Sequence, residues 1–450
     1  MNLESTVDVL VIGGGGCGLV SAIAAGRLGR TVALIEKSAK LGGHTMSTSA
    51  IVPAAGTRFQ SEKGVDDSSE IMLQDILRQN GGICDINQAK TLCDTSKELV
   101  EWLCDECNVP ISLILDFNYT GHSRFRMHTT PNRTGSDLIG ILAKEIQKLP
   151  NVFVLCERSA TDLMVEHGVV KGAEVRAGNL TEKIYAKNTI LATSGFGANP
   201  ELKKKYIPLV TQMAYWGSST HTGEAIIWGE KLGADLTYMD SYQAHSAVSS
   251  VGTLVNWVTM LTGGIMVNVN GRRFGNETMS YSSFAELLVQ QPSQQGFEIY
   301  DEEIHQHMLK EFEEYRQTVS LGGVVRCGNA AGVSTKFSIN ETALGDTLSQ
   351  YSKAAGSNTD EFGRTNFKKL SSPLYVVKVT PALFHTQGGL RVNKHTQVLK
   401  NDGSVISNLY AGGGAAAGIS GSGATGYLTG NGLLSALCYG FIAGRECGTN

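Results

Sequence analysis

The stretch Val7–Gly26, VDVLVIGGGGCGLVSAIAAG, decides the fold. Its first part, Val7–Ile12, is a short apolar run rich in β-branched residues, as in a buried parallel strand. Gly13, Gly15 and Gly18 follow at the GxGxxG spacing, and an Ala-rich helical segment begins at once. In such a turn one glycine makes the tight bend, one lets the backbone approach a pyrophosphate, and one lets the helix pack on the strand. Because the N-terminus of that helix presents free N–H groups to phosphates, the stretch predicts a dinucleotide site.

A second predicted strand supports this interpretation. Thr31–Ile35 is again apolar, and it ends at Glu36. This acid lies 18 residues beyond Gly18 (36 − 18), near the spacing of about 20 expected for a carboxylate that binds ribose. The glycine pattern alone also fits a turn in an unrelated α/β fold. Strand, turn, helix, second strand and acid together predict dinucleotide binding.

Length and composition limit the classes of protein. With 450 residues the chain exceeds one ordinary hydrophobic core, so we expect two or more domains. The net charge of −4 gives no reason to expect nucleic acid or an anionic membrane as a partner. No stretch reaches the roughly 18 apolar residues of a membrane span, and the run from Val7 lacks the basic flank of a signal peptide. We therefore expect a cytoplasmic protein that acts on a small molecule.

The nine cysteines lack the spacing of a disulfide framework, and their odd number favours a reducing compartment. Cys104 and Cys107 form a CxxC pair, but with Glu101, Trp102 and Leu103 they fit an amphipathic helix. No second pair follows in the sequence. We therefore expect ordinary helix cysteines here and no metal site.

The rest of the first half alternates between helical and strand patterns. Residues 66–112 show helical periodicity, and a helix over 138–149 is expected with Ser136 or Asp137 as its N-cap. The basic, turn-rich segment 121–128 fits either the lining of a cleft or a solvated loop. Strands are expected at 152–156, 162–166 and 169–175, and Thr189–Gly195 is expected to end another strand in a glycine turn. Their spacing predicts a β-meander inserted in a parallel sheet.

The composition shifts between about Asp240 and Thr380, where polar helices replace the glycine-rich strand ends. The first pattern returns at Asn408–Gly414 and continues into a predicted helix over 431–447. We therefore expect one discontinuous domain, 1–239 with 381–450, and a second domain over 240–380.

Taken in chain order, the motifs resemble those of the FAD-dependent fumarate reductase / succinate dehydrogenase flavoprotein family, which also contains the 3-ketosteroid dehydrogenases. Beside the first turn and Glu36, the matching pieces are Gly42-Gly43, Ala192–Gly195, Thr222–Glu224, Gly264–Asn268, Arg273–Glu277, His385–Gly389 and Leu409–Gly413. The resemblance implies an α/β fold: a discontinuous, Rossmann-like FAD-binding domain with an inserted β-meander, and an α+β capping domain. It also implies hydride exchange between flavin N5 and a carbon–carbon bond beside a carbonyl.

The resemblance also assigns a cofactor site. The residues expected to contact FAD are Gly13, Gly15, Gly16, Cys17, Gly18, Glu36, Lys37, Gly42, Gly43, His44, Thr45, Ser49, Thr193, Ser194, Gly195, Thr222, Glu224, Gly388, Gly413, Gly414, Gly432, Leu433 and Leu434. His44 aligns with the histidine that carries covalent flavin in succinate dehydrogenases, whereas most relatives bind FAD without that bond.

Two positions depart from the members that act on dicarboxylates. Those members carry an arginine proton donor four residues after the glutamate that matches Glu277, and here Tyr281 takes that place. A second arginine, which clamps a carboxylate, is replaced by Tyr427 ahead of Gly430-Asn431. A phenol does not reproduce the bidentate contact of a guanidinium. Fumarate and succinate are therefore not the expected substrates.

The tyrosines instead resemble the pattern of the ketosteroid dehydrogenases. That resemblance assigns proton transfer to Tyr281, and stabilisation of the ketone oxygen to Tyr427 and the N–H of Gly430. His385 matches a histidine that binds the substrate carbonyl or carboxylate, and His245 lies near the position of another. The plain alternatives are core aromatics with a polar tip and structural histidines.

Three functions remain open. The two tyrosines favour interconversion of a saturated ketone and its α,β-enone, on a steroid or another hydrophobic substrate. His385 and the basic Arg124–Arg133 loop favour reduction of an unsaturated acid. The third function is that of a flavoprotein subunit that transfers electrons within a larger complex. The cysteine spacings of haem-attachment and iron–sulfur sites are absent from the sequence, so a separate protein would have to supply those electrons.

Overall fold

The computed structural model describes residues 4–355 and 359–449. They form two compact units. Unit 1 takes the described residues of Met1–Pro208, Gly217–Tyr242 and His385–Asn450, and unit 2 takes those of Leu209–Trp216 and Gln243–Phe384. The assignment of an FAD-binding and a capping role to two parts of the chain stays a prediction.

Unit 1 is a layered α/β unit. Its strands are β1 (Glu4–Ile12), β2 (Val32–Glu36), β3 (Val52–Pro53), β4 (Ser112–Leu113), β5 (Met127–Thr129), β6 (Val152–Cys156), β7 (Ser159–Glu166), β8 (Val169–Ala177), β9 (Leu180–Leu191), β11 (Leu236–Thr237), β17 (Gly389–Leu390), β18 (Gln397–Leu399) and β19 (Val405–Ala411). Its helices are α1 (Gly16–Arg27), η1 (Gly43–Ser47), α2 (Arg58–Ser61), α3 (Ser69–Asn80), α4 (Ile86–Asp105), α5 (Gly135–Ile146), α6 (Pro200–Tyr206), α7 (Glu224–Lys231), η4 (Gly413–Ala415) and α14 (Asn431–Thr449).

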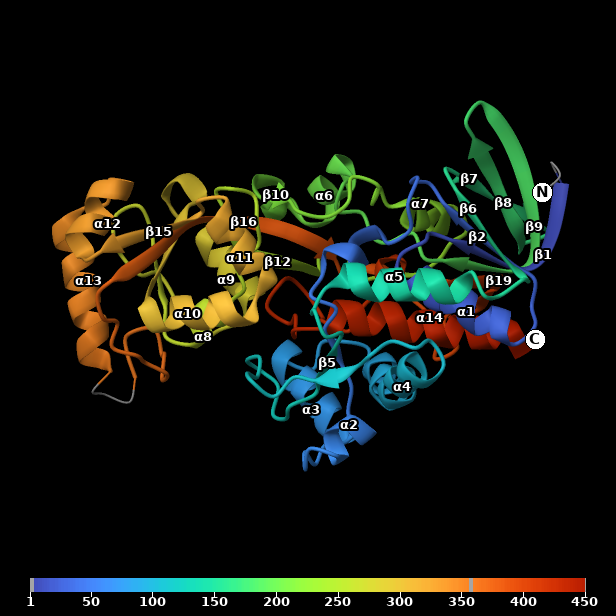
Figure 1. The fold of residues 1–450 in the computed structure, drawn as a ribbon. Helices are drawn as coiled ribbons and strands as arrows, with labels where there is room; N and C mark the ends of the chain where they lie inside the picture. Colours follow the sequence, from blue (N-terminus) through green and yellow to red (C-terminus); the bar gives the residue numbers. More distant parts are fainter. Residues whose placement is uncertain (1–3, 356–358, 450) are drawn as a thin grey trace. The chain divides into compact units, whose positions relative to one another are not determined.

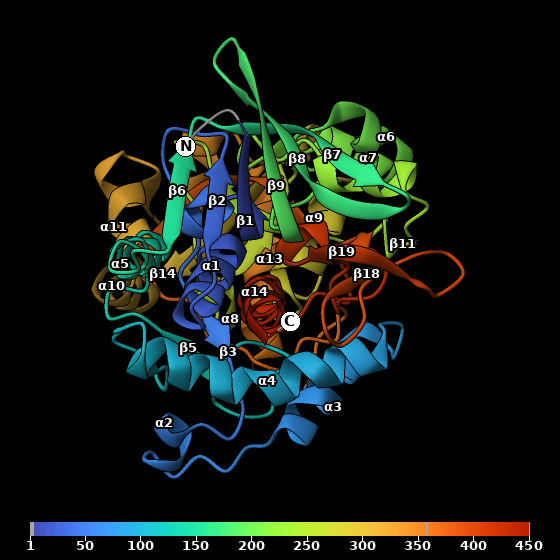
Figure 2. The same ribbon diagram turned by 90° about the vertical axis from the view of Figure 1, so that its right-hand side faces the viewer.

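The main sheet of unit 1 has the strand order β18-β19-β9-β1-β2-β6 (Figure 2). Strands β19, β9, β1, β2 and β6 pair in parallel, with Val9 opposite Val32 between β1 and β2. Antiparallel β7 and β8 join this sheet through β9, which confirms the predicted β-meander. The buried apolar strands place the carboxyl ends of β1, β2 and β9 side by side, where ligands bind in open α/β sheets.

Helices α1 and α14 pack against each other in unit 1 (Figure 1). Glycines allow the close approach, because a Cβ at Gly440 would lie 2.5 Å from the carbonyl oxygen of Cys17. A Cβ at Gly444 would lie 2.4 Å from that of Ser21. The last helix of the chain therefore supports the first glycine turn.

Two local predictions differ from the structure. The N-cap of α5 is Thr134, whose hydroxyl accepts a hydrogen bond from the N–H of Asp137, rather than Ser136 or Asp137. Cys107 lies beyond the end of α4 at Asp105, and it is fully buried. Cys107 is therefore not part of the helix that its spacing predicted, and it is buried by contacts outside that helix.

Unit 2 is an α+β unit. Its strands are β10 (Ala214–Tyr215), β12 (Tyr242–Ser249), β13 (Ile265–Val267), β14 (Gly296–Asp301), β15 (Val324–Gly328) and β16 (Leu374–Thr386), of which Tyr242 and His385–Thr386 belong to unit 1. Its helices are α8 (Val258–Leu261), α9 (Tyr281–Leu288), η3 (Pro292–Gln294), α10 (Glu302–Glu311), α11 (Glu313–Ser320), α12 (Ala330–Phe337) and α13 (Glu341–Ala354). The sheet has the order β10-β16-β14-β13, and β12 and β15 also pair with β16.

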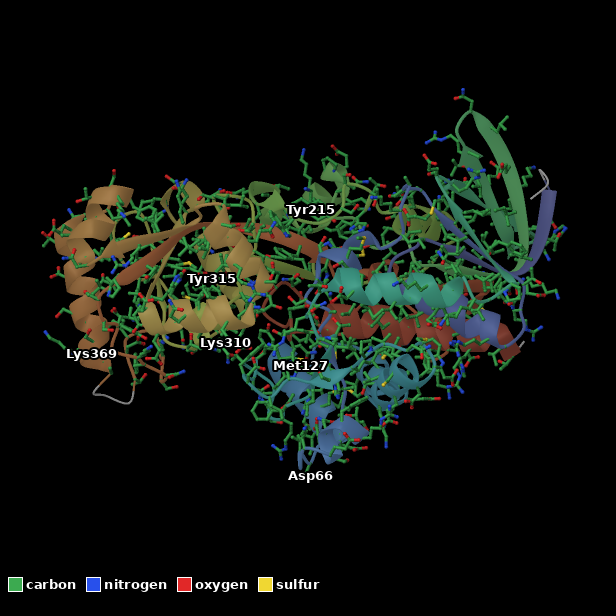
Figure 3. All side chains as sticks on the ribbon, in the orientation of Figure 1. Asp66, Met127, Tyr215, Lys310, Tyr315 and Lys369 are labelled. Atoms are coloured by element: carbon green, nitrogen blue, oxygen red, sulfur yellow. The ribbon has the colours of Figure 1, made fainter. Side chains whose placement is uncertain are left out.

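The interior of unit 2 contains a polar cluster as well as an apolar core. Tyr315 of α11 (Figure 3) shares a 2.7 Å hydrogen bond with the hydroxyl of Tyr300. Its hydroxyl also lies 2.7 Å from Nδ1 of His305, and that ring stacks on Tyr375 at 4.0 Å. Among the residues that the structure describes, no helix is both long and apolar enough to cross a lipid bilayer.

Glu298 on β14 is a fully buried carboxyl group in unit 2. Its Oε2 accepts a 3.0 Å hydrogen bond from the Thr259 hydroxyl, and its Oε1 has no hydrogen-bond partner among the described residues. Burial raises the pKa of Glu298 to about 8, so the folded protein retains a proton that the unfolded chain releases near pH 4.5. The free energy of unfolding therefore falls as the pH rises through this window.

Replacing Glu298 with glutamine should remove this pH dependence, because the amide stays neutral. We expect Glu298→Gln to be more stable than the parent at pH 8 by about 2–4 kcal/mol and similar to it at pH 4. Urea unfolding of the holoprotein at both pH values measures the difference. Glu361→Gln, at an exposed position, should leave the pH dependence in place. Equal pH slopes for Glu298→Gln and the parent would contradict the expectation.

Candidate functional site

The turn between β1 and α1 leaves no room for side chains at two glycines. Gly13 has φ +111°, and a Cβ there would lie 2.3 Å from the carbonyl oxygen of Ala192 at the end of β9. A Cβ at Gly18 would lie 1.8 Å from the carbonyl oxygen of Gly13. These two glycines therefore hold strand, turn and helix together.

Gly15 in the same turn faces open space instead. The nearest atom to a Cβ there is the carbonyl oxygen of Gly42, at 3.7 Å. The two loops are joined by a 2.8 Å hydrogen bond from the N–H of Gly42 to the carbonyl oxygen of Gly14. On the other side, the Thr45 hydroxyl accepts from the N–H of Gly16 at 3.2 Å. Gly15 thus lines a cradle made of backbone.

Glu36 is anchored at the end of β2 by both carboxylate oxygens. Its Oε2 accepts a 2.8 Å hydrogen bond from the N–H of Gly14, and its Oε1 accepts one of the same length from the N–H of Ser38. Each carboxylate oxygen can accept more than one hydrogen bond. The acid is therefore held rigid and keeps acceptor capacity for ribose hydroxyls.

A polar group just after β2 and at the start of α7 joins three of the predicted cofactor residues. The Lys37 ammonium lies 2.7 Å from Oε1 of Glu224 and donates to the Thr222 hydroxyl at 3.2 Å. The Thr222 hydroxyl also donates to Glu224 at 2.6 Å. Glu224 Oε2 is buried and has no hydrogen-bond partner among the described residues.

The segment after β9 contacts the C-terminal motifs. Ser194 adopts φ +64°, and a Cβ at Gly195 would lie 2.0 Å from the Thr386 hydroxyl oxygen. A Cβ at Gly414 would lie 2.8 Å from the nitrogen of Gly195. The Thr193 hydroxyl is buried and has no partner in the described part of the chain. Segments more than 190 residues apart thus meet at the carboxyl end of the sheet.

The other predicted cofactor residues have mainly packing contacts. Cys17 packs its thiol against Gly412, and burial raises its pKa to about 12, so its backbone alone is available to a ligand. Ser49 accepts a hydrogen bond from the Thr129 hydroxyl at its carbonyl oxygen. The remaining members are Gly43 in η1, Gly388 beside Tyr238, Gly413 beside Cys17, and the buried Leu433 and Leu434 in α14.

Two histidines of unit 1, His221 and His385, lie beside His44. Its ring centroid lies 6.0 Å from that of His221 and 5.9 Å from that of His385. Burial lowers the pKa of His44 to about 4 and those of the other two to about 3. All three side chains are therefore neutral near pH 7. His221 was not among the residues that the sequence singled out, although it directly precedes the Thr222–Glu224 motif.

Tyr427 lies beside this histidine group. Its ring centroid is 5.8 Å from that of His385, in an edge-on arrangement. Gly430 adopts φ +91°, and a Cβ there would lie 2.6 Å from Pro53. The structure thus brings His385, Tyr427 and Gly430 into one region of unit 1, and their catalytic roles stay predictions.

The loop that carries Tyr427 is held by earlier segments of unit 1. The His122 Nε2–H donates to the carbonyl oxygen of Thr429 at 3.0 Å, and burial lowers the pKa of His122 to about 3. The Gln79 amide donates to the carbonyl oxygen of Thr425 at 2.8 Å. The Asn80 amide donates to that of Ile419 at 2.9 Å. Segment 121–128 is therefore only partly packed inside the unit: His122 and residues 126–128 are buried, whereas Ser123 and Arg124 are exposed.

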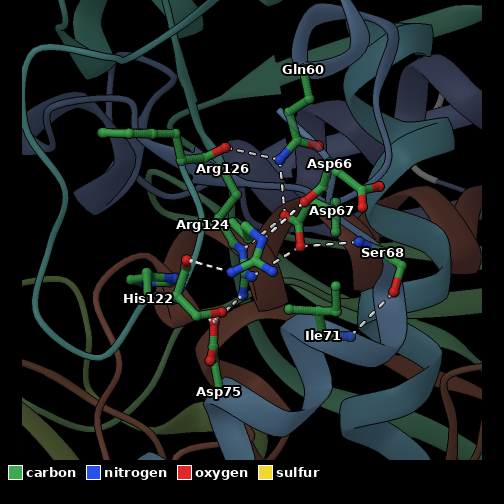
Figure 4. Close-up of polar contacts among 12 residues, drawn as sticks. Gln60, Asp66, Asp67, Ser68, Ile71, Asp75, His122, Arg124 and Arg126 are labelled. Carbon is green, nitrogen blue, oxygen red and sulfur yellow. Dashed lines mark hydrogen bonds and ion pairs between the residues drawn. The ribbon is translucent and has the colours of Figure 1, made fainter. Parts of the chain in front are cut away.

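Figure 4 shows the ion-pair group at the centre of this segment. The guanidinium of Arg126 is fully buried and bridges Asp67, at 3.0 Å, and Asp75, at 2.8 Å. Asp75 also accepts from the N–H and hydroxyl of Ser123, both at 2.8 Å, and pairs with Arg78. Two arginines and two aspartates therefore balance their charges within the protein.

The other arginines of the basic loop are also engaged. Arg133 forms a two-bond ion pair with Asp116 at 3.0 Å. Arg124 donates to the carbonyl oxygens of Asp66 and Ser123. Arg126 and Arg133 are thus paired with carboxylates, whereas Arg124 contacts backbone carbonyl oxygens.

Tyr281 begins α9 in unit 2 and stacks on His245 of β12, with the ring centroids 4.5 Å apart. The carbonyl oxygen of Tyr281 accepts from the Ser246 hydroxyl at 2.6 Å, which ties α9 to β12. The N–H of Ala247 donates to Nδ1 of His245 at 3.0 Å, so this neutral ring carries its proton at Nε2. Burial lowers its pKa to about 3.

Aromatic rings surround this pair in unit 2. The centroid of His245 lies 6.3 Å from Trp257 and 5.5 Å from Phe384, which stacks on Trp216. The sequence predicted Tyr281 and noted His245, but it did not indicate that the two rings stack. Their contact depends on the pairing of α9 with β12, which local periodicity does not encode.

The FAD binding domain family matches residues 8–433 of the chain. The chain belongs to this family. This match confirms the resemblance drawn from the motifs and identifies FAD as the cofactor. The family's relatives include fumarate reductases, and membership makes the chain an FAD-dependent oxidoreductase.

Three known proteins illustrate the relationship. An NADH:fumarate oxidoreductase of Klebsiella pneumoniae is 28% identical over 98% of this chain, which spans only 47% of that protein. A solved flavocytochrome c3 fumarate reductase is 27% identical, with a TM-score of 0.83 over 99% of this chain and 78% of that one. A 3-ketosteroid-Δ4-(5α)-dehydrogenase from Rhodococcus jostii, solved with 4-androstene-3,17-dione, has a TM-score of 0.78 over 99% and 97% at 23% identity, which shows the fold alone.

The residues at the carboxyl end of the sheet fit FAD. The backbone cradle at Gly15 suits a pyrophosphate, and Glu36 keeps acceptor capacity for a ribose. The buried, unpartnered Thr193 hydroxyl and Glu224 Oε2 offer further polar contacts among the described residues. These contacts to FAD stay predictions for the individual residues.

Replacing Gly15 with alanine tests the cradle directly. The φ of Gly15 is −78°, which alanine adopts freely, and an added Cβ would lie 3.7 Å from its nearest neighbour, the carbonyl oxygen of Gly42. We expect Gly15→Ala to fold normally and bind FAD at least tenfold more weakly, because the methyl group occupies ligand space. Equilibrium dialysis with FAD measures affinity, and circular dichroism checks folding. Unchanged FAD affinity would place the pyrophosphate elsewhere. Gly18→Ala should instead fail at the folding stage.

Proposed function

We propose that this chain interconverts a saturated ketone and its α,β-enone, with a steroid-like or other hydrophobic cyclic ketone as substrate. The proposal adds the substrate class to the oxidoreductase chemistry of the family. The electron partner and the direction of the reaction in the cell are left unassigned.

The observation that carries the proposal is the internal pairing of the buried arginines. In the described residues these are Arg126 and Arg364, and each pairs with carboxylates of its own unit. Arg364 lies 3.0 Å from Glu277 and donates to the carbonyl oxygens of Gly264 and Met260. A buried substrate carboxylate without a cationic partner would be costly. A neutral carbonyl oxygen needs only hydrogen-bond donors.

The groups at the predicted catalytic positions are neutral. His385 and Tyr427 in unit 1 would hold the carbonyl oxygen as hydrogen-bond donors, where negative charge develops on enolisation. Tyr281 in unit 2 would transfer the proton of the neighbouring carbon. Its apolar surroundings, with Trp257 and Phe384 around His245, support a hydrophobic substrate.

When bound, FAD supplies the two-electron chemistry at the carbon–carbon bond. The residues of the chain would orient the cofactor through the Gly15 cradle and Glu36. His385 and Tyr427 would polarise the carbonyl, which acidifies the adjacent C–H bond. This division of roles leaves proton transfer to the phenol of Tyr281, which would act as the acid in the direction of enone reduction.

The two alternative functions are reduction of an unsaturated acid and electron transfer within a larger complex. Reduction of an unsaturated acid drew on the basic loop, and the pairing of Arg126 and Arg133 with aspartates removes that argument. His385 still fits a carboxylate as a donor. An electron-transfer subunit remains a second candidate because the chain spans only part of several relatives. Co-purification with another protein would favour it.

The decisive experiment uses the purified holoprotein under anaerobic conditions. FAD is reduced with dithionite, and either a 3-keto-4-ene steroid or fumarate is added. Return of the oxidised flavin spectrum with the enone alone supports the proposal. Rapid reoxidation by fumarate alone would overturn it, since that result requires a carboxylate site. Reoxidation by neither compound also counts against a ketone substrate of this class.

A further inference from the structure

Gln387 lies next to His385 and contacts its ring through the side-chain amide. Nε2 of Gln387 is 3.0 Å from Nδ1 of His385. The Ser420 hydroxyl donates to Oε1 of Gln387 at 3.1 Å, and the Asn431 amide donates to that hydroxyl at 3.3 Å. The side chains of Gln387, Ser420 and Asn431 are all buried in unit 1. The four groups form one hydrogen-bonded row.

The chemistry of these groups decides which one donates and which one accepts in each hydrogen bond of the row. An amide NH₂ can only donate, so the Ser420 hydroxyl accepts from Asn431 and has one proton left for Gln387. The NH₂ of Gln387 then faces Nδ1 of His385, which must accept. A neutral imidazole that accepts at Nδ1 carries its proton at Nε2.

Turning over Gln387 alone would point two NH₂ groups at the Ser420 hydroxyl and remove the oxygen to which that hydroxyl donates. In the observed arrangement the unpartnered atom is Oδ1 of Asn431, which has no hydrogen-bond partner among the described residues. Turning both amides would instead leave the NH₂ of Asn431 in that position. Buried N–H groups without a partner are rarer in proteins than under-satisfied oxygens. The observed direction is therefore the favourable one.

Gly432 keeps the other edge of the His385 ring accessible. A Cβ at Gly432 would lie 2.8 Å from Nε2 and 2.7 Å from Cε1 of that ring. Any side chain at this position would press on the nitrogen that carries the proton. The glycine at the start of α14 thus leaves space in front of Nε2.

We infer that Gln387, set by Ser420 and Asn431, is a positioning residue that holds His385 in its Nε2–H form so that the ring donates a hydrogen bond to the substrate carbonyl. The donor role of His385 rests on the proposed function. The tautomer itself does not, because it follows from contacts within unit 1. A glutamine is suited to this task because it stays neutral and leaves the ring neutral.

Gln387→Glu reverses the direction of the hydrogen bond to Nδ1 of His385 with almost no change in side-chain shape. The carboxylate accepts from Ser420 and from an Nδ1–H, which raises the pKa of His385 and deprotonates Nε2 of the neutral ring. The groups facing His385 from other segments are His44, His221 and Tyr427. Burial lowers the pKa values of the two histidines, so both are neutral near pH 7. The substitution therefore adds the one new charge in this cluster.

The test reads the tautomer by ¹⁵N NMR of the holoprotein labelled at histidine, with signals assigned by their loss in His385→Gln. We expect the parent to show a protonated Nε2 and an unprotonated Nδ1, and Gln387→Glu to show a protonated Nδ1. A protonated Nδ1 in the parent would overturn the inference. Gln317→Glu, at an exposed position of α11, should leave the His385 signals unchanged.

Kinetics with the enone substrate form the second arm. Above the raised pKa of His385, kcat/KM of Gln387→Glu should fall roughly 10²-fold, the usual loss for one donor to a developing oxyanion. Activity should return as the pH falls and Nε2 is protonated again. The expected tautomer exchange without any change in kcat/KM would reject the carbonyl-binding role of His385 and leave the positioning by Gln387 intact. An unchanged tautomer in Gln387→Glu would reject the positioning itself.

Discussion

Replacing Tyr281 with phenylalanine is expected to lower kcat for enone reduction by about 10²–10⁴-fold, the range for loss of one general acid. The ring remains, so its 4.5 Å stacking on His245 and the packing of α9 on β12 should be preserved. FAD content and the urea midpoint should therefore match those of the parent. Stopped-flow reoxidation of the reduced holoprotein measures the chemical step directly.

Two controls make this result specific. Tyr206→Phe removes a phenol that contacts Glu230 at an exposed position, and its rate should equal that of the parent. A solvent deuterium isotope effect on the parent rate should be lost or altered in Tyr281→Phe if the phenol delivers the proton. A rate for Tyr281→Phe within twofold of the parent would remove Tyr281 from the proposed mechanism and favour its role as a core aromatic.

Replacing Arg126 with methionine is expected to destabilise the protein by about 3–5 kcal/mol, because Asp67 and Asp75 are left buried without their shared cation. The urea midpoint of the holoprotein measures this loss. Arg133→Gln provides the matched control. Its ion pair with Asp116 is partly exposed, so the cost should be below about 1 kcal/mol.

A triple variant separates charge from packing. Arg126→Met combined with Asp67→Asn and Asp75→Asn removes the uncompensated charges, so it should be clearly more stable than Arg126→Met alone. The network also reaches the predicted substrate region, since Ser123 follows His122, which donates to Thr429. Arg126→Met should therefore also weaken activity. A loss of less than about 1 kcal/mol in Arg126→Met would show that the aspartates find other partners or bind protons.

The buried histidines and arginines have the same electrostatic character within each unit. In unit 1, burial keeps His44, His221 and His385 neutral. In unit 2, His245 is neutral as well. With the buried guanidinium groups matched to carboxylates, the positions named for catalysis offer hydrogen-bond donors and no free cation among the described residues. This balance supports a carbonyl substrate over a dicarboxylate.

Much of unit 1 could be predicted from the sequence because its signals are local. The β-branched run, the glycine spacing and Glu36 lie within 30 residues of each other, and each acts through its own backbone. The strand–turn–helix, the second strand, the β-meander and the last helix were therefore found with small errors at their ends. The family motifs then added FAD and the candidate residues.

The tertiary structure alone decided which of these residues meet. His221 joins His44 across more than 170 residues, and Arg126 pairs with Asp67 and Asp75, which precede it by 59 and 51 residues (126 − 67 and 126 − 75). Gln387 is set by Ser420, 33 residues away. Such contacts depend on how distant segments pack together, and no local sequence pattern encodes that packing. For this protein, local sequence patterns determined the strand–turn–helix that is predicted to bind the cofactor. Long-range packing determined which buried arginines pair with carboxylates and which nitrogen of His385 carries the proton.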